Sequence, residues 1–476
     1  MSLRSKLLAA ACIGVLMQIV PAAGQSQRNL ILFVPDGLRP NSVTPETAPT
    51  LAAVRDKGVN FVNPHALFPT FTMANASGLA TGHFLGDTGA FGNTIYTAYP
   101  VPTAGGSVTP FIENDPILGD IDAHFSGNFV DEDTILFAAR RQGFSTAAIG
   151  KLGPTLMFDH TERTGNATIT IDDSTGSKQG ISLSQEMQDA LKSAGLSLAA
   201  PSRKDTPGDN SNAGNFEKPG TLVANIVQQK YFADVAAKVV LPMFKARNKP
   251  FVLVFWSRDP DGTQHNQGDS HLKVSPGING PTSLASIKNA DDNLADLRKA
   301  LDELGLAGTT DIVVAADHGF STISKESKSS PAAQASYADV PAGLLPPGFL
   351  AIDIAKALDL PLYDPDDKNK TVEAGKHTSR GNGLIGNDPE KPAVVVAANG
   401  GANLIYVPDK DSTRTGKVID ALLAQDYVSG LFVDSDIGSF AGTLPLSAIT
   451  CRARHAHRGL RLWSISTPMR PIAGNP

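Results

Sequence analysis

The chain has 476 residues, of which 41% are hydrophobic and 18% are charged, with a formal net charge of −6. This composition supports a packed core and excludes a disordered or fibrous protein. The net charge leaves no broad basic surface for duplex nucleic acid or an anionic membrane. The length exceeds that of an ordinary domain, but large α/β enzymes reach it as one domain.

The two ends of the chain differ from its body. Residues 1–24 place Arg4 and Lys6 before the apolar run 7–20, a pattern typical of a secretory signal peptide. We therefore expect export to the periplasm or the medium, and no membrane contact after cleavage, because no later run is long enough to span a bilayer. Residues 451–476 hold five arginines and no acid. With two cations and no acid in the first 24 residues, residues 25–450 carry 34 cations against 47 acids, a net charge of −13.

Three short apolar runs, each followed by acidic residues, mark the body of the chain. The first run, 29–35, precedes Asp36, and the second, 251–256, precedes the 259–261 segment. The third run, 311–316, precedes Asp317. Such runs are typical of buried strands. Further strands are predicted at 59–62, 145–149, 394–397 and 404–407, and helices at 48–57, 134–142, 221–245, 283–304 and 417–425.

This alternation predicts an α/β fold, with a central, mostly parallel sheet and helices on both faces. We expect a single catalytic domain over 25–450. The ranges 98–125 and 160–220 are rich in Gly, Ser, Thr, Asn and Asp, and are predicted to be long surface insertions.

Acidic and imidazole side chains follow the predicted strands in two motifs. Asp317 and His318 are adjacent after the third run, and Asp261 lies four residues before His265 after the second. In parallel sheets, ligands bind beyond the carboxyl ends of the strands. Together with Asp36, these side chains form a set of oxygen and nitrogen ligands that suits zinc or a related transition metal better than calcium or magnesium.

Thr72 is the candidate nucleophile. It lies in a Thr-rich turn, F-P-T-F-T-M-A-N, that leads into a predicted helix. Backbone N–H groups and the helix dipole favour negative charge at a helix N-terminus, and a metal ion lowers the pKa of a coordinated hydroxyl. The alternative is that Thr70 or Thr72 only caps the helix.

These motifs occur in the order and approximate spacing of one family. They are Asp36-Gly37, T-x-T-x-x-N at 70–75, P-D-x-x-x-H at 260–265, and D-H-G at 317–319. The chain resembles the type I phosphodiesterase/nucleotide pyrophosphatase family of the alkaline phosphatase superfamily, and we therefore expect an alkaline-phosphatase-like fold.

The resemblance implies two zinc ions and a covalent phospho-threonine intermediate on Thr72. One zinc ion would be held by Asp36, Thr72, Asp317 and His318. The other would be held by Asp261, His265 and a further histidine near the C-terminus. Asn75 would donate a hydrogen bond to the phosphoryl group.

The expected substrate is a small, phosphorylated, nucleotide-like molecule. Monoesterases with a threonine nucleophile carry a Lys-x-Arg pair, whereas this chain has Lys151 followed by Gly153 at the arginine position. Without the guanidinium fork, a dianionic monoester loses a bidentate partner. A phosphodiester or nucleotide pyrophosphate is therefore favoured over a monoester, and Lys151 is a candidate phosphate ligand.

This chain departs from the family's pattern at the last zinc ligand. The family's Gly-x-His-Gly run is absent, and the remaining candidates are His377, His455 and His457. We hypothesise that the chain leaves its native reading frame near Thr450, so that the second zinc site is incomplete. The alternatives are then an active phosphodiesterase, a phosphomonoesterase, or an inactive metal-binding protein.

Overall fold

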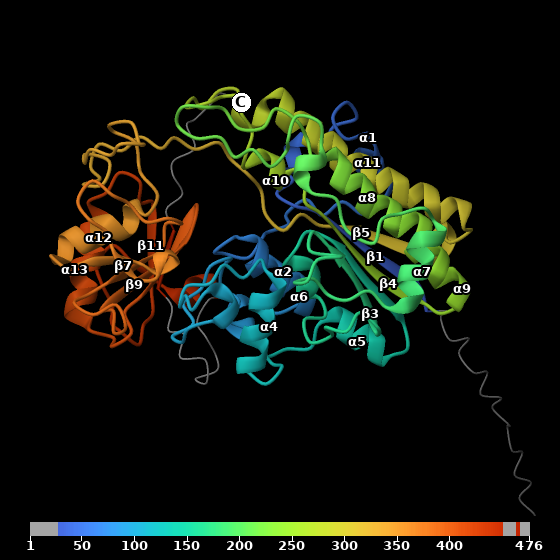
Figure 1. The fold of residues 1–476 in the computed structure, drawn as a ribbon, viewed down its shortest axis with the longest axis horizontal. Helices are drawn as coiled ribbons and strands as arrows, with labels where there is room; N and C mark the ends of the chain where they lie inside the picture. The colour runs from blue at the N-terminus through green and yellow to red at the C-terminus, as the bar shows by residue number, and fades with distance from the viewer. Residues whose placement is uncertain (1–26, 451–462, 467–476) are drawn as a thin grey trace, which may run out of the picture.

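The computed structural model describes residues 27–450 and the backbone of 463–466. The predicted signal peptide, His455 and His457 lie outside the described residues. Five parallel strands form the central sheet, in the order β3-β2-β4-β1-β5 (Figure 1). Their bounds are β1 (Asn29–Pro35), β2 (Ser145–Gly150), β3 (Thr168–Asp172), β4 (Phe251–Ser257) and β5 (Thr310–Val314).

Helices cover both faces of this sheet, as predicted. Alternate β1 side chains enter two cores, Ile31 and Phe33 on one face and Leu32 and Val34 on the other. One core is covered by α1 (Pro49–Lys57), α7 (Gln185–Ser193), α8 (Ile226–Val235), α9 (Leu241–Arg247) and α11 (Pro281–Glu303). The other is covered by α2 (Thr72–Thr81), α3 (Leu85–Thr88), α4 (Asp115–His124), α5 (Ile135–Arg141) and α6 (Pro154–Met157).

A second sheet extends the molecule beyond α2–α6 (Figure 1). Its eight strands run in the order β12-β11-β13-β10-β9-β8-β6-β7 and pair mainly antiparallel. Their bounds are β6 (Leu362–Asp364), β7 (Lys370–Thr371), β8 (Gly383–Ile385), β9 (Val394–Asn399), β10 (Ala402–Tyr406), β11 (Gly430–Val433), β12 (Leu444–Pro445) and β13 (Trp463–Ser466). The helices α12 (Phe349–Leu358) and α13 (Ser412–Leu423) pack on its outer face. Of the Arg-rich tail, Trp463–Ser466 therefore pairs within this sheet, between β10 and β11.

Four details differ from the sequence-based expectations. The predicted strand at 59–62 pairs with no strand of the described chain, and Val59, Phe61 and Val62 are exposed. The predicted insertion 160–220 supplies β3 to the central sheet, because Ile169 and Ile171 alternate with buried threonines that hide the strand pattern. β5 is an edge strand, and of its residues only Thr310 is buried, whereas Asp311 and Val313 are exposed and Ile312 and Val314 are half-buried.

The fourth difference concerns the long helix predicted at 221–245. The helical path begins at Ile226 and includes a π-helical segment, Ala236–Val240, between α8 and α9. Pro242 follows this segment and has no backbone N–H to donate, which accounts for the irregular turn. No helix of the described residues is both long and apolar enough to cross a membrane.

A pair of buried carboxyl groups joins the end of β3 to the start of α4. Asp115 and Asp172 are almost fully buried and interact with each other, and Ser174 donates to both. Burial, followed by the charge of Asp172, raises the pKa of Asp115 to about 9. The two carboxyl groups therefore share a proton at neutral pH.

The Asp115→Asn protein is expected to be less destabilised by alkaline pH. The folded protein holds the shared proton more tightly than the unfolded chain, so its stability falls as the pH rises from about 4 towards 9. An asparagine supplies a permanent N–H donor, and should raise the free energy of unfolding at pH 8.5 by ~1 kcal/mol or more, with no gain at pH 4.5. Urea unfolding at the two pH values measures this, and an identical pH dependence in both proteins would contradict the shared proton.

Candidate active site at the carboxyl ends of the central strands

The three acidic motifs converge where β1, β4 and β5 end. Asp36 follows β1, and its backbone carbonyl accepts a hydrogen bond from the N–H of Asp261, which begins the short helix α10 (Asp261–Gln264) after β4. The Oδ1 atom of Asp317, which follows β5, accepts from the N–H of Gly37 at 3.0 Å. Because parallel strands end at one edge, residues more than 200 positions apart become neighbours.

Asp36, Asp317 and His318 form the cluster best suited to a metal ion. One ligand atom from each lies within 4.8 Å of the other two. Asp36 Oδ1 and Asp317 Oδ2 are buried and have no hydrogen-bond partner in the described chain. His318 Nε2 lies 3.3 Å from Asp317 Oδ2 and 3.5 Å from Asp36 Oδ1. Two orphaned carboxylate oxygens beside an imidazole nitrogen fit the donor set of a zinc-type cation.

The pKa values of this cluster reflect crowded charge. Burial, followed by the Asp36 carboxylate, raises the pKa of Asp317 to about 7. Burial lowers the pKa of His318, but the Asp317 and Asp36 carboxylates outweigh it and raise the value to about 9. Negative charge that is concentrated in a buried site attracts a cation.

The Thr72 hydroxyl lies at this cluster. Thr72 is the first residue of α2, and the N-cap position belongs to Phe71, so Thr72 does not act as the helix cap. Its Oγ1 lies 3.3 Å from His318 Nε2 and accepts a hydrogen bond from Lys151 Nζ at 3.2 Å. Only 2% of Thr72 is exposed.

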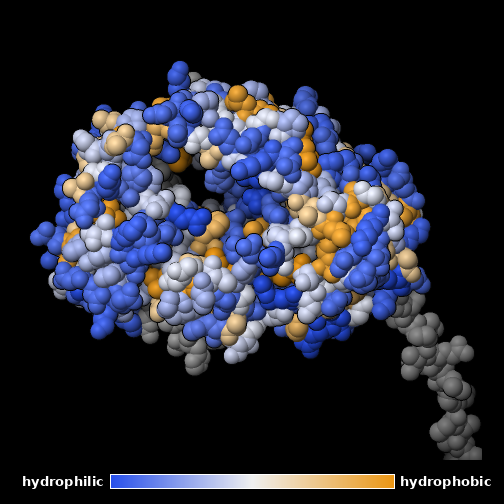
Figure 2. All heavy atoms as spheres, viewed as in Figure 1, coloured by the Kyte–Doolittle hydropathy of each residue, from blue (hydrophilic) through white to orange (hydrophobic). Residues whose placement is uncertain are grey.

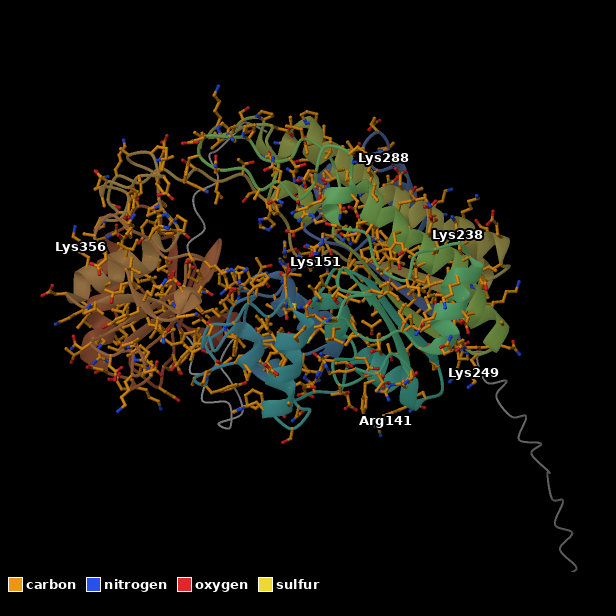
Figure 3. All side chains as sticks on the ribbon, in the orientation of Figure 1. Arg141, Lys151, Lys238, Lys249, Lys288 and Lys356 are labelled. Atoms are coloured by element: carbon orange, nitrogen blue, oxygen red, sulfur yellow. The ribbon has the colours of Figure 1, made fainter. Side chains whose placement is uncertain are left out.

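Lys151 is a buried cation at the centre of the site (Figure 3). Its Nζ donates to Asp36 Oδ2 at 2.8 Å and to Asp261 Oδ2 at 3.2 Å, and lies 3.6 Å from Glu113 Oε2. Burial lowers the pKa of Lys151, but the three carboxylates outweigh it and raise the pKa well above its ordinary value. Lys151 therefore remains charged and holds the second oxygen of each aspartate.

Trp256 completes the support of Asp36. Its indole Nε1 donates to Asp36 Oδ2 at 2.8 Å, beside the contact from Lys151. With Oδ2 occupied by two donors, Oδ1 is the oxygen that remains for a cation. Outer contacts of this kind orient metal ligands. The sequence did not reveal this role, because Trp256 reads as an ordinary core residue at the end of an apolar run.

Asp261 and His265 form the second predicted metal pair. His265 Nε2 lies 3.1 Å from Asp261 Oδ1, and the His265 side chain is 65% exposed. Burial raises the pKa of Asp261, but Lys151 outweighs it and holds the pKa well below its usual range. His377 instead contacts Asp339, so it does not join this pair. Within the described chain, no third His, Cys, Asp or Glu completes the set.

Asn75 lies close to the nucleophile, but its amide is already engaged. Its Nδ2 donates to Thr70 Oγ1 and to the Phe71 carbonyl, and its Oδ1 accepts from the Leu67 N–H. These contacts hold the turn that precedes α2. A phosphoryl oxygen would have to replace one of these acceptors.

Asn93 and Glu113 are site residues that the motifs did not identify. Asn93 Oδ1 accepts from the N–H of Met73, the residue after Thr72, and its Nδ2 donates to Glu113 Oε1 at 2.7 Å. Glu113 in turn approaches Lys151. Glu113 belongs to the predicted insertion 98–125, where no strand or helix pattern marks it.

Figure 2 shows a hollow in the face of the molecule, between the lobe that carries the second sheet and the body, with hydrophilic residues along much of its rim. In the same orientation, Lys151 lies beside this hollow (Figure 3). Asn399, at the end of β9, links the two parts, because its side chain accepts from the Thr94 N–H and donates to the Thr94 carbonyl.

Gly153 occupies a position where no larger residue fits. Its φ is +91°, and a Cβ there would come within 2.6 Å of Glu113 Cα. The arginine of a Lys-x-Arg pair is therefore excluded by the backbone as well as being absent from the sequence. The nearby guanidinium of Arg258 is instead paired with Asp173, which also accepts from the Leu152 N–H.

Gly153→Ala is expected to lower the free energy of unfolding by ~2–4 kcal/mol, because backbone strain adds to the steric clash. Gly127→Ala is the matched control, since Gly127 has a similar φ of +82° but open space around it. It should lose only ~1 kcal/mol. Urea unfolding measures both, and equal losses would show that the contact with Glu113 is unimportant.

Comparisons with known proteins identify the family and the fold. The sequence matches the family model described as type I phosphodiesterase / nucleotide pyrophosphatase over residues 30–412. A solved structure of phosphonoacetate hydrolase from Sinorhizobium meliloti 1021 with phosphonoacetate is similar, at 16% identity and a TM-score of 0.51, over 93% of this chain and 81% of that chain. No curated protein sequence matches this chain.

A second solved structure is murine ectonucleotide pyrophosphatase / phosphodiesterase 5, an inactive variant in complex with AMP. It is 16% identical over 93% of this chain and 79% of that chain, with a TM-score of 0.46. The family match spans all four motifs and most of the chain. The chain therefore belongs to the type I phosphodiesterase/nucleotide pyrophosphatase family, and has an alkaline-phosphatase-like fold.

Proposed function

We propose that this phosphoric ester hydrolase cleaves phosphodiester or nucleotide pyrophosphate bonds through a covalent intermediate on Thr72. The observation that carries the proposal is the position of the Thr72 hydroxyl, in contact with both His318 and Lys151. A hydroxyl is a poor nucleophile unless nearby charge favours its ionised form.

The chain's own residues can perform both halves of such a reaction. Thr72 Oγ1 forms the new bond to phosphorus as the bond to the leaving oxygen breaks, and water later releases the phosphoryl group from Thr72. Lys151, which remains protonated, stabilises the ionised hydroxyl through its 3.2 Å contact. Asn93 is better suited than Asn75 to donate to a phosphoryl oxygen, because its contacts within the described chain use only one of its two amide protons.

Two zinc ions are the proposed cofactors. Asp36, Thr72, Asp317 and His318 would hold the first, and Asp261 and His265 would contribute to the second. Bound zinc supplies positive charge that lowers hydroxyl and water pKa values and stabilises developing charge on oxygen.

The proposed substrate class is a small nucleotide-like diester or pyrophosphate. The absence of room for an arginine at Gly153 supports a diester over a monoester. The solved relatives hold AMP and phosphonoacetate, which are both small phosphorus compounds. The amino-terminal pattern supports export to the periplasm or the medium.

The decisive experiment compares hydrolysis of bis-p-nitrophenyl phosphate and p-nitrophenyl phosphate by the zinc-loaded protein. Faster turnover of the diester supports the proposal, and faster turnover of the monoester refutes the substrate assignment. No turnover of either compound, with zinc bound as shown by metal analysis, would support the alternative of an inactive metal-binding protein. The observation that favours this alternative is that Asp261 and His265 have no third metal ligand among the residues that the structure describes.

A further inference from the structure

The carboxylate of Glu113 lies beside the reacting groups, and the proposed mechanism gives it no role. Its side chain is 10% exposed, with Oε2 3.6 Å from Lys151 Nζ. Its Oε1 accepts from Asn93 Nδ2, and Asn93 also contacts the N–H of Met73 next to Thr72. The carboxylate therefore contacts Lys151 directly, and it is linked through Asn93 to the backbone next to Thr72.

The Glu113 carboxylate contributes to the balance of charges around Lys151. Lys151 faces three carboxylates, those of Asp36, Asp261 and Glu113. Asp36 and Asp261 belong to the proposed metal sites, whereas Glu113 is in neither set. Glu113 thus places a further carboxyl group beside Lys151, outside both proposed metal sets. Burial raises the pKa of Glu113, and the charges of Lys151 and Arg258 oppose that rise.

The backbone of Glu113 also occupies the space next to Gly153. A Cβ on Gly153 would meet Glu113 Cα and carbonyl carbon at 2.6 and 3.1 Å. The space that a side chain at position 153 would need is therefore filled by the backbone of Glu113. The residue that faces position 153 is therefore an acid, which interacts with the cations Lys151 and Arg258.

We propose that Glu113 selects the charge of the phosphoryl group, and restricts the site to groups that carry one negative charge. This inference rests on the proposed function. A dianionic monoester meets stronger repulsion from the carboxylate than a monoanionic diester, because Coulomb energy scales with the product of the charges. The same repulsion favours departure of a dianionic product after hydrolysis.

The first test compares kcat/KM for the two p-nitrophenyl esters at pH 8.5 in the zinc-loaded full chain. Glu113→Gln keeps the shape and removes the charge, so the ratio of monoester to diester turnover should rise about tenfold or more. Glu113→Asp keeps the charge and should retain the wild-type ratio. Glu303→Gln is the control, because Glu303 is an exposed acid at the end of α11.

The second test measures binding rather than turnover. Inorganic phosphate is titrated calorimetrically into the zinc-loaded Thr72→Ala protein, with and without Glu113→Gln. The added substitution should tighten phosphate binding about tenfold. Glu113→Ala, which also removes the charge, replaces Glu113→Gln in both tests if the latter fails to fold.

The two proposals fail in different ways. Diester hydrolysis that survives Thr72→Ala, or is absent from the wild type, refutes the proposed function, and phosphate binding still reports the effect of Glu113. Thr72-dependent hydrolysis with an unchanged ester ratio and unchanged phosphate affinity in Glu113→Gln refutes the role of Glu113 alone.

Discussion

Thr72→Ala should lower kcat/KM for bis-p-nitrophenyl phosphate at least about a thousandfold, because it removes the atom that would bond to phosphorus. Thr72→Ser keeps a hydroxyl at the same place and should retain measurable turnover. The Thr72 side chain is buried against Lys151 and His318, so zinc content must be measured in each variant. Steady-state kinetics on metal-matched protein separates lost chemistry from lost metal.

Thr81→Ala is the matched control for this experiment. Thr81 lies at the other end of α2, where its hydroxyl donates to the Ser77 carbonyl. Its loss should leave turnover within about twofold. Mass spectrometry of acid-quenched wild-type enzyme should find a phosphoryl adduct on the peptide that contains Thr72. Thr72→Ala with unimpaired hydrolysis would exclude Thr72 as the nucleophile.

Lys151→Met should lower the free energy of unfolding of the metal-free protein by ~3–5 kcal/mol. The substitution preserves much of the side-chain volume, but leaves Asp36, Asp261 and Glu113 as buried carboxylates without their shared cation. Unfolding in urea with a chelator measures the loss. Added zinc should recover part of it, because a ligand that binds the folded state stabilises that state.

Lys288→Met is the control for this prediction. Lys288 forms an exposed ion pair with Asp292 on α11 and lies far from Lys151 in Figure 3. Such surface pairs contribute little, so the change should remain within ~0.5 kcal/mol. A Lys151→Met protein as stable as the wild type in chelator would mean that Lys151 does not hold the carboxylates together.

Much of the central architecture was predictable from local pattern. The runs at 29–35, 251–256 and 311–316 are β1, β4 and β5, and the acids that follow them meet at one edge. The reason is that parallel strands repeat a strong local signal: a short apolar run that ends in polar residues. Where the signal was weaker, prediction failed. The apolar residues of 59–62 predicted a strand that does not form, and the threonine-rich strand β3 was not predicted.

The sequence by itself determined the family, the central parallel sheet and the members of the candidate metal cluster, because these depend on ordered motifs and on periodicity. Only the tertiary structure decided which polar groups surround the nucleophile. Lys151, Trp256 and Glu113 come from separate segments and meet around Asp36, and the Glu113 backbone leaves Gly153 no room for a side chain. Contacts of this kind depend on long-range packing, which leaves no periodic trace in any one segment.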